Sequence, residues 1–482
     1  MDYSKILSIL CSPLSMIVHA MAAQPAKNAG ALIAVNAISG ALPLIHGPMG
    51  CATLRKINSF SIYSFFPHTP CTNMKEVDLV YGAGDRLDRA IIEAYEKYNP
   101  SIIVVIPTCP SDMIGDDIAS AVNKASKEVK CKVVYSTGEL IKGRPIGYHD
   151  VVYSILDQLL PEGFKVNKKS DSVNIITFPI HSSENKMSEF QNILIEMGIN
   201  INKIFFYNTK VEDIYELPKA QLNITDSSAP WLRLIEKRFG IPYYLISSLE
   251  HMEYNPYGIE ESSRVFMDIA DRFGKKDYAR NVIEAKREDA KFRLQQEIRD
   301  IQGIRIAVVG GFFFGMGSLF MKDLKLKPVL LIYKTYGLES HGMSKDTIKK
   351  IIDMDLNMAS QYGIKPQVLV NPTYIEEIKA IKNSEIDIVI APSSDIPVYH
   401  QKGIRAFDSL KFYANFLKIG FECPILLSKL LKKELSRKIK RTPLVCMIDH
   451  DLYRSDLHPS WIKAEKVWRK VTEGTDGGCL YG

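Results

Sequence analysis

The sequence of 482 residues lacks the features that mark several large classes of protein. It has no low-complexity tract, no short-period repeat and no heptad pattern, which excludes fibrous and coiled-coil proteins. Lys and Arg outnumber Asp and Glu only slightly, 61 against 55, and apart from a basic cluster at residues 429–441 the excess is spread along the chain. Because a protein that binds nucleic acid usually carries more positive charge in a stripe, no nucleic-acid partner is expected.

Long apolar runs are also scarce. The strongest candidate lies at the N-terminus, where an apolar segment follows Lys5 and ends in small residues, an outline typical of a secretory signal. Asp2, Pro13 and His19 interrupt that outline. No other stretch approaches the roughly 18 uninterrupted apolar residues that a membrane helix needs. We therefore expect a cytoplasmic protein without a membrane partner.

Cysteine is sparse and unevenly placed, with eight residues in the whole chain. So few cysteines do not form a disulfide scaffold, and no CxxC or CxxxxC pair of a zinc site occurs. Cys51, Cys71 and Cys109 nevertheless fall in motif-like segments near the N-terminus, whereas no cysteine lies between Cys131 and Cys423. This uneven distribution is the first indication of function.

The sequence does contain short apolar or β-branched runs that alternate with segments of helical periodicity. This alternation predicts an α/β fold, with three Rossmann-like domains built on mainly parallel sheets. Apolar spacing between Ile114 and Ala125 predicts an amphipathic helix packed on the first sheet. The predicted strands are 101–108, 132–136, 173–180, 203–208, 242–247, 304–309, 328–333, 367–370 and 386–391.

Two polar stretches, at residues 167–172 and 284–300, predict domain boundaries because each precedes a new strand. Each resulting unit is long enough for one small α/β domain. The predicted division is a first, cysteine-bearing domain at 1–170, a second at 171–300, a third at 301–427 and a C-terminal extension at 428–482.

The three N-terminal cysteines share a local setting that suits metal binding. Cys51 follows glycines in HGPMGC, Cys71 follows a proline in HTPCTNMKE, and Cys109 follows a predicted strand in TCPSDMIGDD. All three stand beside predicted helix starts, where the helix dipole favours a thiolate, the ligand that iron–sulfur clusters require. A single such cysteine is more often a small buried apolar residue. Three thiolates are also one short of a closed site, so a fourth ligand would come from a second chain or a non-cysteine group.

The segments around these cysteines resemble the component 1 proteins of nitrogenase and their relatives. The resemblance rests on GALPLIHGPMGCATL, CTNMKEVDLVYGAGDRLDRAI and IIVVIPTCPSDMIGDDIASAV, in this order along the chain. Residues 221–244 and 255–270 resemble the middle domain of the family, and residues 304–324 and 385–404 resemble its third domain. The resemblance covers roughly residues 25–425.

The resemblance implies that Cys51, Cys71 and Cys109 hold an iron–sulfur cluster, of the 8Fe-7S or 4Fe-4S type, at an interface between two similar subunits. It implies two partners, a second component 1 chain and an ATP-dependent iron–sulfur reductase that delivers electrons. The chain itself has no GxxxxGKS/T motif for ATP. The expected function is therefore that of an oxidoreductase, a subunit of a nitrogenase-like reductase that relays electrons to a small-molecule substrate.

The sequence departs from the catalytic alpha chain of nitrogenase at the two residues that anchor its large active-site cofactor. Where the family has a cysteine near the start of a middle-domain helix, residues 226–231 contain none. Near the position of the anchoring histidine in the third domain, His400 is the one histidine present. The chain therefore resembles a beta-type subunit, or a nitrogenase-like reductase of a tetrapyrrole or an alkyl thioether, more than an alpha chain.

Two alternative functions stay open from the sequence. One is a scaffold of the same family that binds a precursor during assembly of a complex metal cofactor, without turnover. The other is an unrelated, non-redox α/β protein that binds a ligand and has structural cysteines.

Other candidate sites are weaker. The glycine loop at residues 310–318 lacks the GxGxxG spacing of a nucleotide site, and the basic cluster at residues 429–441 is expected to be a surface helix. Asp116 and Asp117 are expected to stabilise a helix N-terminus rather than to bind a metal. The three C-terminal cysteines are expected to be unligated, namely Cys423, Cys446 and Cys479.

Overall fold

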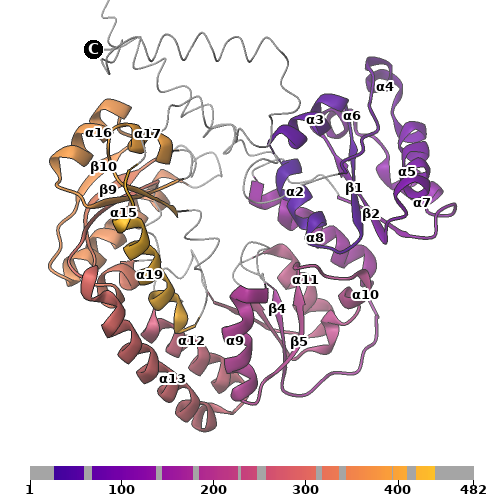
Figure 1. Cartoon of the computed structure of the whole chain (residues 1–482). Helices are drawn as coiled ribbons and strands as arrows, with labels where there is room; N and C mark the ends of the chain where they lie inside the picture. Colours follow the sequence, from indigo (N-terminus) through magenta and orange to yellow (C-terminus); the bar gives the residue numbers. More distant parts are fainter. Residues whose placement is uncertain are drawn as a thin grey trace, which may run out of the picture.

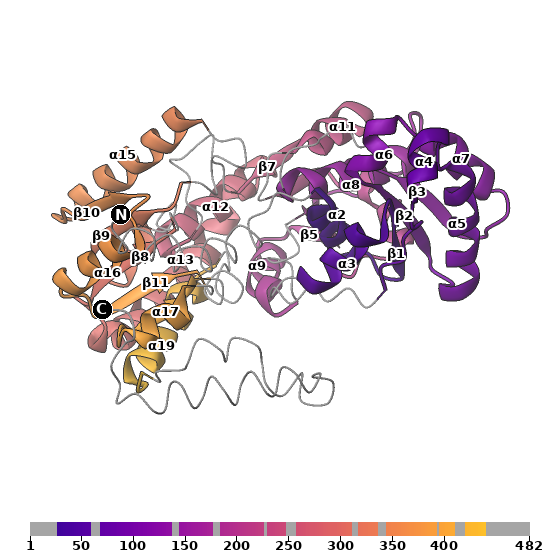
Figure 2. The same cartoon turned by 90° about the horizontal axis from the view of Figure 1, so that it is seen from above.

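Within the described residues, the strands form three sheets in which all neighbouring strands pair in parallel. The predicted α/β class with parallel sheets is therefore confirmed. Figure 1 shows the three units one after another along the chain, and Figure 2 shows the first and third at opposite ends of the molecule. The computed structural model describes residues 27–58, 68–136, 144–176, 184–225, 229–246, 257–310, 317–335, 344–392, 395–409 and 420–439.

The first sheet has the order β1-β2-β3 and is covered by helices on both faces. Its central strand is buried at every position, with Ile102, Val104 and Ile106 facing α2 and α8 while Ile103 and Val105 face α5 and α7. The predicted amphipathic helix corresponds to α7. The elements are α2 (Lys27–Asn36), β1 (Ala41–His46), α3 (Met49–Asn58), α4 (Glu76–Tyr81), α5 (Gly84–Tyr98), β2 (Ile102–Pro107), α6 (Cys109–Ile114), α7 (Ile118–Ala125), β3 (Lys132–Tyr135) and α8 (Arg144–Leu159).

The second sheet has the order β5-β4-β6-β7. It shares a core with the first sheet, because Ile176, Phe205 and Trp231 lie in the same buried cluster as the residues of α2 and α8. The elements are β4 (Ser172–Ile176), α9 (Glu184–Glu196), β5 (Asn200–Phe205), α10 (Val211–Ile214), β6 (Leu222–Thr225), α11 (Pro230–Phe239), β7 (Tyr243–Leu245), α12 (Ile259–Arg272) and α13 (Lys276–Glu297).

The third sheet has the order β10-β9-β8-β11-β12. At the end of β9, the hydroxyl of buried Tyr333 donates a hydrogen bond of 2.6 Å to the carboxylate of buried Asp355 on α15. The elements are β8 (Arg305–Val309), the π-helical turn η3 (Leu319–Asp323), β9 (Lys327–Tyr333), α15 (Lys345–Gln361), β10 (Gln367–Val370), α16 (Tyr374–Asn383), β11 (Ile388–Ala391), α17 (Ile396–Gln401), β12 (Ala406–Asp408) and α19 (Glu422–Ser436).

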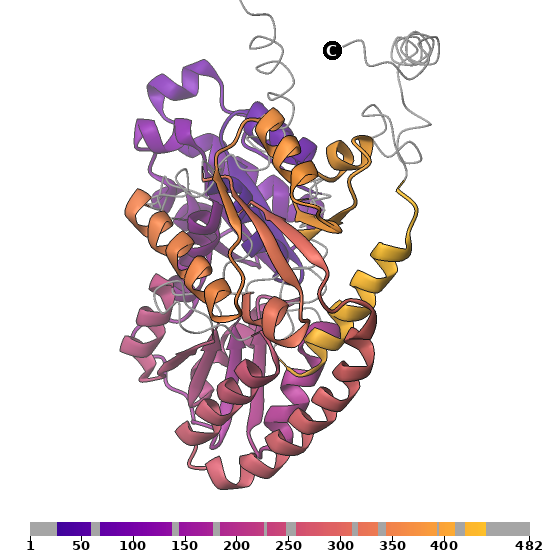
Figure 3. The same ribbon diagram turned by 90° about the vertical axis from the view of Figure 1, so that its left-hand side faces the viewer.

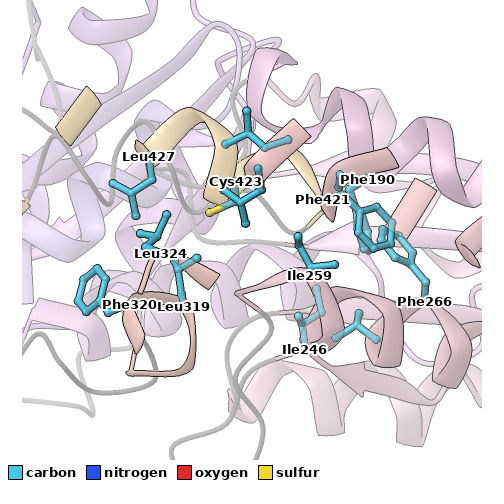
Figure 4. Close-up of a cluster of buried hydrophobic side chains, with 14 of the residues drawn as sticks. Phe190, Ile246, Ile259, Phe266, Leu319, Phe320, Leu324, Phe421, Cys423 and Leu427 are labelled. Carbon is cyan, nitrogen blue, oxygen red and sulfur yellow. The ribbon is translucent and has the colours of Figure 1, made fainter. Parts of the chain in front are cut away.

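Helices α12, α13 and α19 join the second sheet to the third. Phe266 of α12 lies between Phe190 and Phe421, with ring centroids at 5.3 and 6.0 Å (Figure 4). Figure 3 shows α19 running along α13, where the Lys432 ammonium lies 3.3 Å from Glu297. The basic cluster at residues 429–441 thus lies partly in α19, whose inner face buries Leu431.

The nine predicted strands correspond to nine of the twelve strands in the described residues, with ends that differ by a few residues. The other three strands, β1, β6 and β12, were not predicted. β1 contains Pro43, which an edge strand tolerates because no partner on that side needs its N–H. The division into domains remains a prediction, and its last boundary, residue 428, falls within α19. No helix within the described ranges is long and apolar enough to cross a membrane, and the predicted features of residues 1–26 lie outside those ranges.

Candidate functional site

The carboxyl edge of the first sheet brings together the turns that carry the three predicted site cysteines. β1 ends at His46 beside Pro107, the last residue of β2. Cys51 follows β1 in the first turn of α3, and Cys109 follows β2 as the first residue of α6. Cys71 forms a parallel bridge with Ile45 of β1. Figure 1 shows α3 and α6 at the same end of the sheet.

The three cysteines differ in their exposure to solvent. Cys51 and Cys71 are half-buried and pack against the apolar cluster under the sheet, whereas Cys109 is exposed. Within the described part of the chain, no three His, Cys, Asp or Glu side chains are placed to hold a metal ion. The ligand role of these cysteines therefore stays a prediction.

The buried histidine His46 connects the three cysteine turns. Its Nδ1 lies 3.2 Å from the hydroxyl of Thr72, the residue after Cys71. Its carbonyl oxygen accepts hydrogen bonds from the backbone N–H of Thr108 at 3.1 Å and from the Thr108 hydroxyl at 2.9 Å. Thr72 follows Cys71, and Thr108 precedes Cys109. These bonds therefore fix the turns of both cysteines to the end of β1, the strand that leads to Cys51.

The other ring nitrogen of His46 lies 2.7 Å from the carboxylate of Asp116, which also accepts a hydrogen bond from the backbone N–H of Ala83 at 3.1 Å. Burial lowers the pKa of His46, although the hydrogen bond and the charge of Asp116 oppose that shift. We assign a neutral ring whose Nε2–H donates to Asp116 and whose Nδ1 accepts from Thr72. The Thr72 oxygen in turn accepts from the N–H of Gly47 at 3.0 Å. Every group in this chain of hydrogen bonds has a partner.

Neither Asp116 nor His46 was assigned this role from the sequence. The expectation of a helix-stabilising role is confirmed for Asp117, which accepts a hydrogen bond from the N–H of Ser120 at the start of α7. Asp116 binds His46 and also the N–H of Ala83, the N-cap residue of α5, so its carboxylate lies at the N-terminus of that helix. The string GDD gave no signal for this difference, because the partners lie 33 and 70 residues away along the chain.

Gly47 has no room for a side chain. A Cβ atom there would lie 2.1 Å from the hydroxyl oxygen of Thr108, whereas a Cβ at Gly50 would have no heavy atom within 4 Å. We expect Gly47→Ala to lower the free energy of unfolding by about 1 to 3 kcal/mol, since overpacking displaces the buried Thr108. Gly50→Ala is the matched control and should leave stability equal or slightly higher. Equal stability of the two variants, measured by chemical denaturation, would contradict the expectation.

An exposed apolar surface borders the cysteine turns. We call it the apolar rim, and it consists of Met49 on α3, Val77, Val80 and Tyr81 on α4, and Met113 on α6. Tyr81 and Met113 are 84% and 85% exposed, and α4 has no buried residue. Because α4 and α6 contact each other, these side chains form a surface typical of a partner interface.

The remaining candidate residues that the structure describes lie on other elements, and the rest lie outside the described ranges. His400 is half-buried in α17, and residues 226–228 of the cofactor-anchoring position lie outside the described ranges. Of the glycine loop, residues 311–316 are likewise outside, and the hydroxyl of Ser318 donates to Glu261 at 2.6 Å. Figure 4 shows Cys423 near Leu324 and Leu427 in an apolar cluster. Cys446 and Cys479 lie outside the described residues.

The fold, with parallel sheets and helices in one chain, is one that a nitrogenase structure shares. The structure is similar to that of nitrogenase Cp1 at pH 6.5, with a TM-score of 0.63 and 19% sequence identity, over 88% of this chain and 90% of the other. Residues 27–428 match the family of nitrogenase component 1 type oxidoreductases. The chain belongs to this family, so the resemblance seen in the sequence is confirmed.

Its relatives within the family include proteins of two different roles. The chain is 25% identical to the nitrogenase iron-molybdenum cofactor biosynthesis protein NifE of Clostridium pasteurianum, over 79% of this chain and 80% of that protein. It is 24% identical to the nitrogenase molybdenum-iron protein alpha chain of Methanothermobacter thermautotrophicus, over 81% of this chain and 82% of the other. At this distance neither role follows from similarity, and the closer resemblance to a beta-type subunit stays a prediction.

Proposed function

We propose that this chain is a subunit of the catalytic component of a nitrogenase-like reductase. In this proposal Cys51, Cys71 and Cys109 hold an iron–sulfur cluster at the interface with a second, identical or homologous component 1 chain. The observation that carries the proposal is the meeting of the three cysteine turns at one sheet edge in a chain of this family. The bound cluster would supply one-electron redox chemistry.

The donor set and its surroundings fit such a group. Thiolates are the ligands that iron–sulfur clusters prefer, and the glycine-containing turn before Cys51 lets the backbone approach a bulky group. Cys51 and Cys71 rest on the apolar core, which limits access of water on that side. Cys109 is exposed, so a second chain can approach it and complete the ligand set.

The apolar rim supports the proposal of a protein partner that delivers electrons. Its exposed residues border the cysteine turns, so a docked partner would stand close to the cluster. The sequence has no motif of its own for ATP hydrolysis. An ATP-dependent iron–sulfur reductase that docks on the rim would supply both the electrons and the ATPase activity for reduction of a small-molecule substrate.

A second candidate function is a scaffold for assembly of a complex metal cofactor. The similarity to NifE over most of both chains favours it, because that relative is a cofactor biosynthesis protein. An unrelated α/β binding protein is excluded by the family match.

Purification without oxygen tests the proposal. The complex that this chain forms should be brown and contain iron, and it should consume electrons in the presence of the cognate reductase, ATP and the correct substrate. Colourless, iron-free protein would overturn both the reductase and the scaffold. Iron without substrate-dependent electron consumption, across candidate tetrapyrrole, thioether and dinitrogen substrates, would favour the scaffold.

A further inference from the structure

We propose that Asp116 is a positioning residue that, through His46, holds the cysteine turns and the apolar rim in one fixed arrangement. The inference rests on the proposed function, since it concerns the residues that would hold the cluster and those that would meet the reductase. It adds a physical link between the cysteine turns and the apolar rim.

Asp116 lies between the two surfaces and binds a residue that adjoins each of them. Its side chain is 6% exposed, and its carboxylate accepts hydrogen bonds from His46 on the cysteine side. On the other side it accepts a hydrogen bond from the N–H of Ala83, two residues after Tyr81 of the rim. The intervening Gly82 has a φ of 88°, and a Cβ there would lie 3.5 Å from Asp116, so the corner between α4 and α5 closes directly over the carboxylate.

The chain of hydrogen bonds continues from His46 to the cysteine turns. Thr72 links the ring to the N–H of Gly47, and the N–H of Met74 donates to the carbonyl oxygen of Gly47 at 3.0 Å. The turn before Cys51 and the segment after Cys71 are therefore fixed to each other, and the same ring connects them to Asp116. A shift of the α4–α5 corner cannot occur without loss of a bond in this chain.

With the assigned tautomer of His46, the geometry favours a carboxylate at position 116. Two N–H donors, from Ala83 and His46, converge on it, and a carboxylate offers only acceptors. An asparagine of the same size has one acceptor oxygen. If that oxygen accepts from His46, the NH₂ group faces the N–H of Ala83, which now lies 3.1 and 3.2 Å from the two carboxylate oxygens. Asp116→Asn therefore weakens the link to Ala83 while it keeps the volume of the side chain.

The test compares Asp116→Asn with Asp117→Asn in the full complex, purified without oxygen. Asp117 is the neighbouring acid, caps α7, and has no contact with His46, so it is a matched control. We measure iron content, the electron paramagnetic resonance spectrum and midpoint potential of the cluster, and the Kd of the cognate reductase. Asp116→Asn should keep iron but change the spectrum and potential of the cluster, and it should raise the Kd of the reductase about tenfold, the change that a loss of about 1.4 kcal/mol gives. Asp117→Asn should match the wild type.

A second pair of variants covers the case in which Asp116→Asn does not fold. Thr72→Val breaks the same chain of hydrogen bonds at its other end and should change the cluster spectrum, whereas Thr72→Ser keeps the hydroxyl and should not. Wild-type complex without iron would overturn the proposed function itself. Iron-containing Asp116→Asn and Thr72→Val with wild-type spectra and reductase affinity would overturn only the positioning role.

Discussion

Replacement of Cys109 by alanine is expected to remove most of the iron that the complex binds. Cys109 is the exposed member of the three, at the first residue of α6, so it faces the region where a second chain would complete the site. Cys51→Ala and Cys71→Ala should have the same effect. Each variant should also weaken association of the subunits, since a cluster with ligands from both chains links them and its binding energy contributes to assembly.

The control replaces the three C-terminal cysteines, Cys423, Cys446 and Cys479, together. Cys423 lies in the apolar core that joins the second and third sheets, far along the chain from the first sheet edge. Iron measured by elemental analysis should stay at the wild-type level in this triple variant. Full iron content in the Cys51, Cys71 and Cys109 variants would contradict the proposed site, and a large loss of iron in the triple variant would show that further ligands exist.

Replacement of Asp355 by asparagine is expected to remove a pH dependence of stability. Burial raises the pKa of Asp355 from its ordinary 3.8 to about 7, and the hydrogen bond from Tyr333 opposes that shift only in part. The native carboxyl thus holds its proton at pH values where the unfolded chain has lost it. Stability from this group is fully present below about pH 4 and is lost as the pH rises to about 7.

The measurement is the difference in unfolding free energy between Asp355→Asn and wild type, followed by chemical denaturation from pH 5 to pH 8. The free energy of unfolding of the variant, relative to that of the wild type, should rise by about 3 kcal/mol over this range. The reason is that the wild type loses about 1.4 kcal/mol for each of the two pH units below the native pKa. Asn keeps an acceptor for the Tyr333 hydroxyl. The exposed residue Asp353 on the same helix gives the control Asp353→Asn. Parallel pH profiles of Asp355→Asn and wild type would show that the native pKa is not raised.

The fold class was predictable because buried parallel strands have a strong local signature. A run such as residues 102–107 is apolar at every position, and both faces of that strand are indeed covered by helices. The strands that were missed have weak signatures. β1 is interrupted by Pro43, and β6 and β12 contain Asn223 and Asp408, residue types that are depleted in strands. Pairing with neighbouring strands rather than local preference makes them strands.

The candidate site was predictable only as a set of residue types. The turns of Cys51, Cys71 and Cys109 and their family resemblance are visible in the sequence, because glycine, proline and cysteine have specific local roles. The hydrogen bonds that hold these turns in place were not visible in the sequence. His46 and Asp116 look like an ordinary strand end and an ordinary helix start, and their partnership depends on a distance that only folding creates.

By itself the sequence determined the parallel α/β class, the family and the positions of three cysteines, since each is carried by local pattern or by matched strings. Only the tertiary structure decided that the turns of these cysteines meet at one sheet edge. It also decided that Gly47 must lack a side chain, that the apolar residues of α4 stay exposed, and that Asp116 binds both His46 and Ala83. The physical reason is that parallel strands place the ends of distant segments side by side, and hydrogen bonds between those ends depend on geometry that local sequence does not contain.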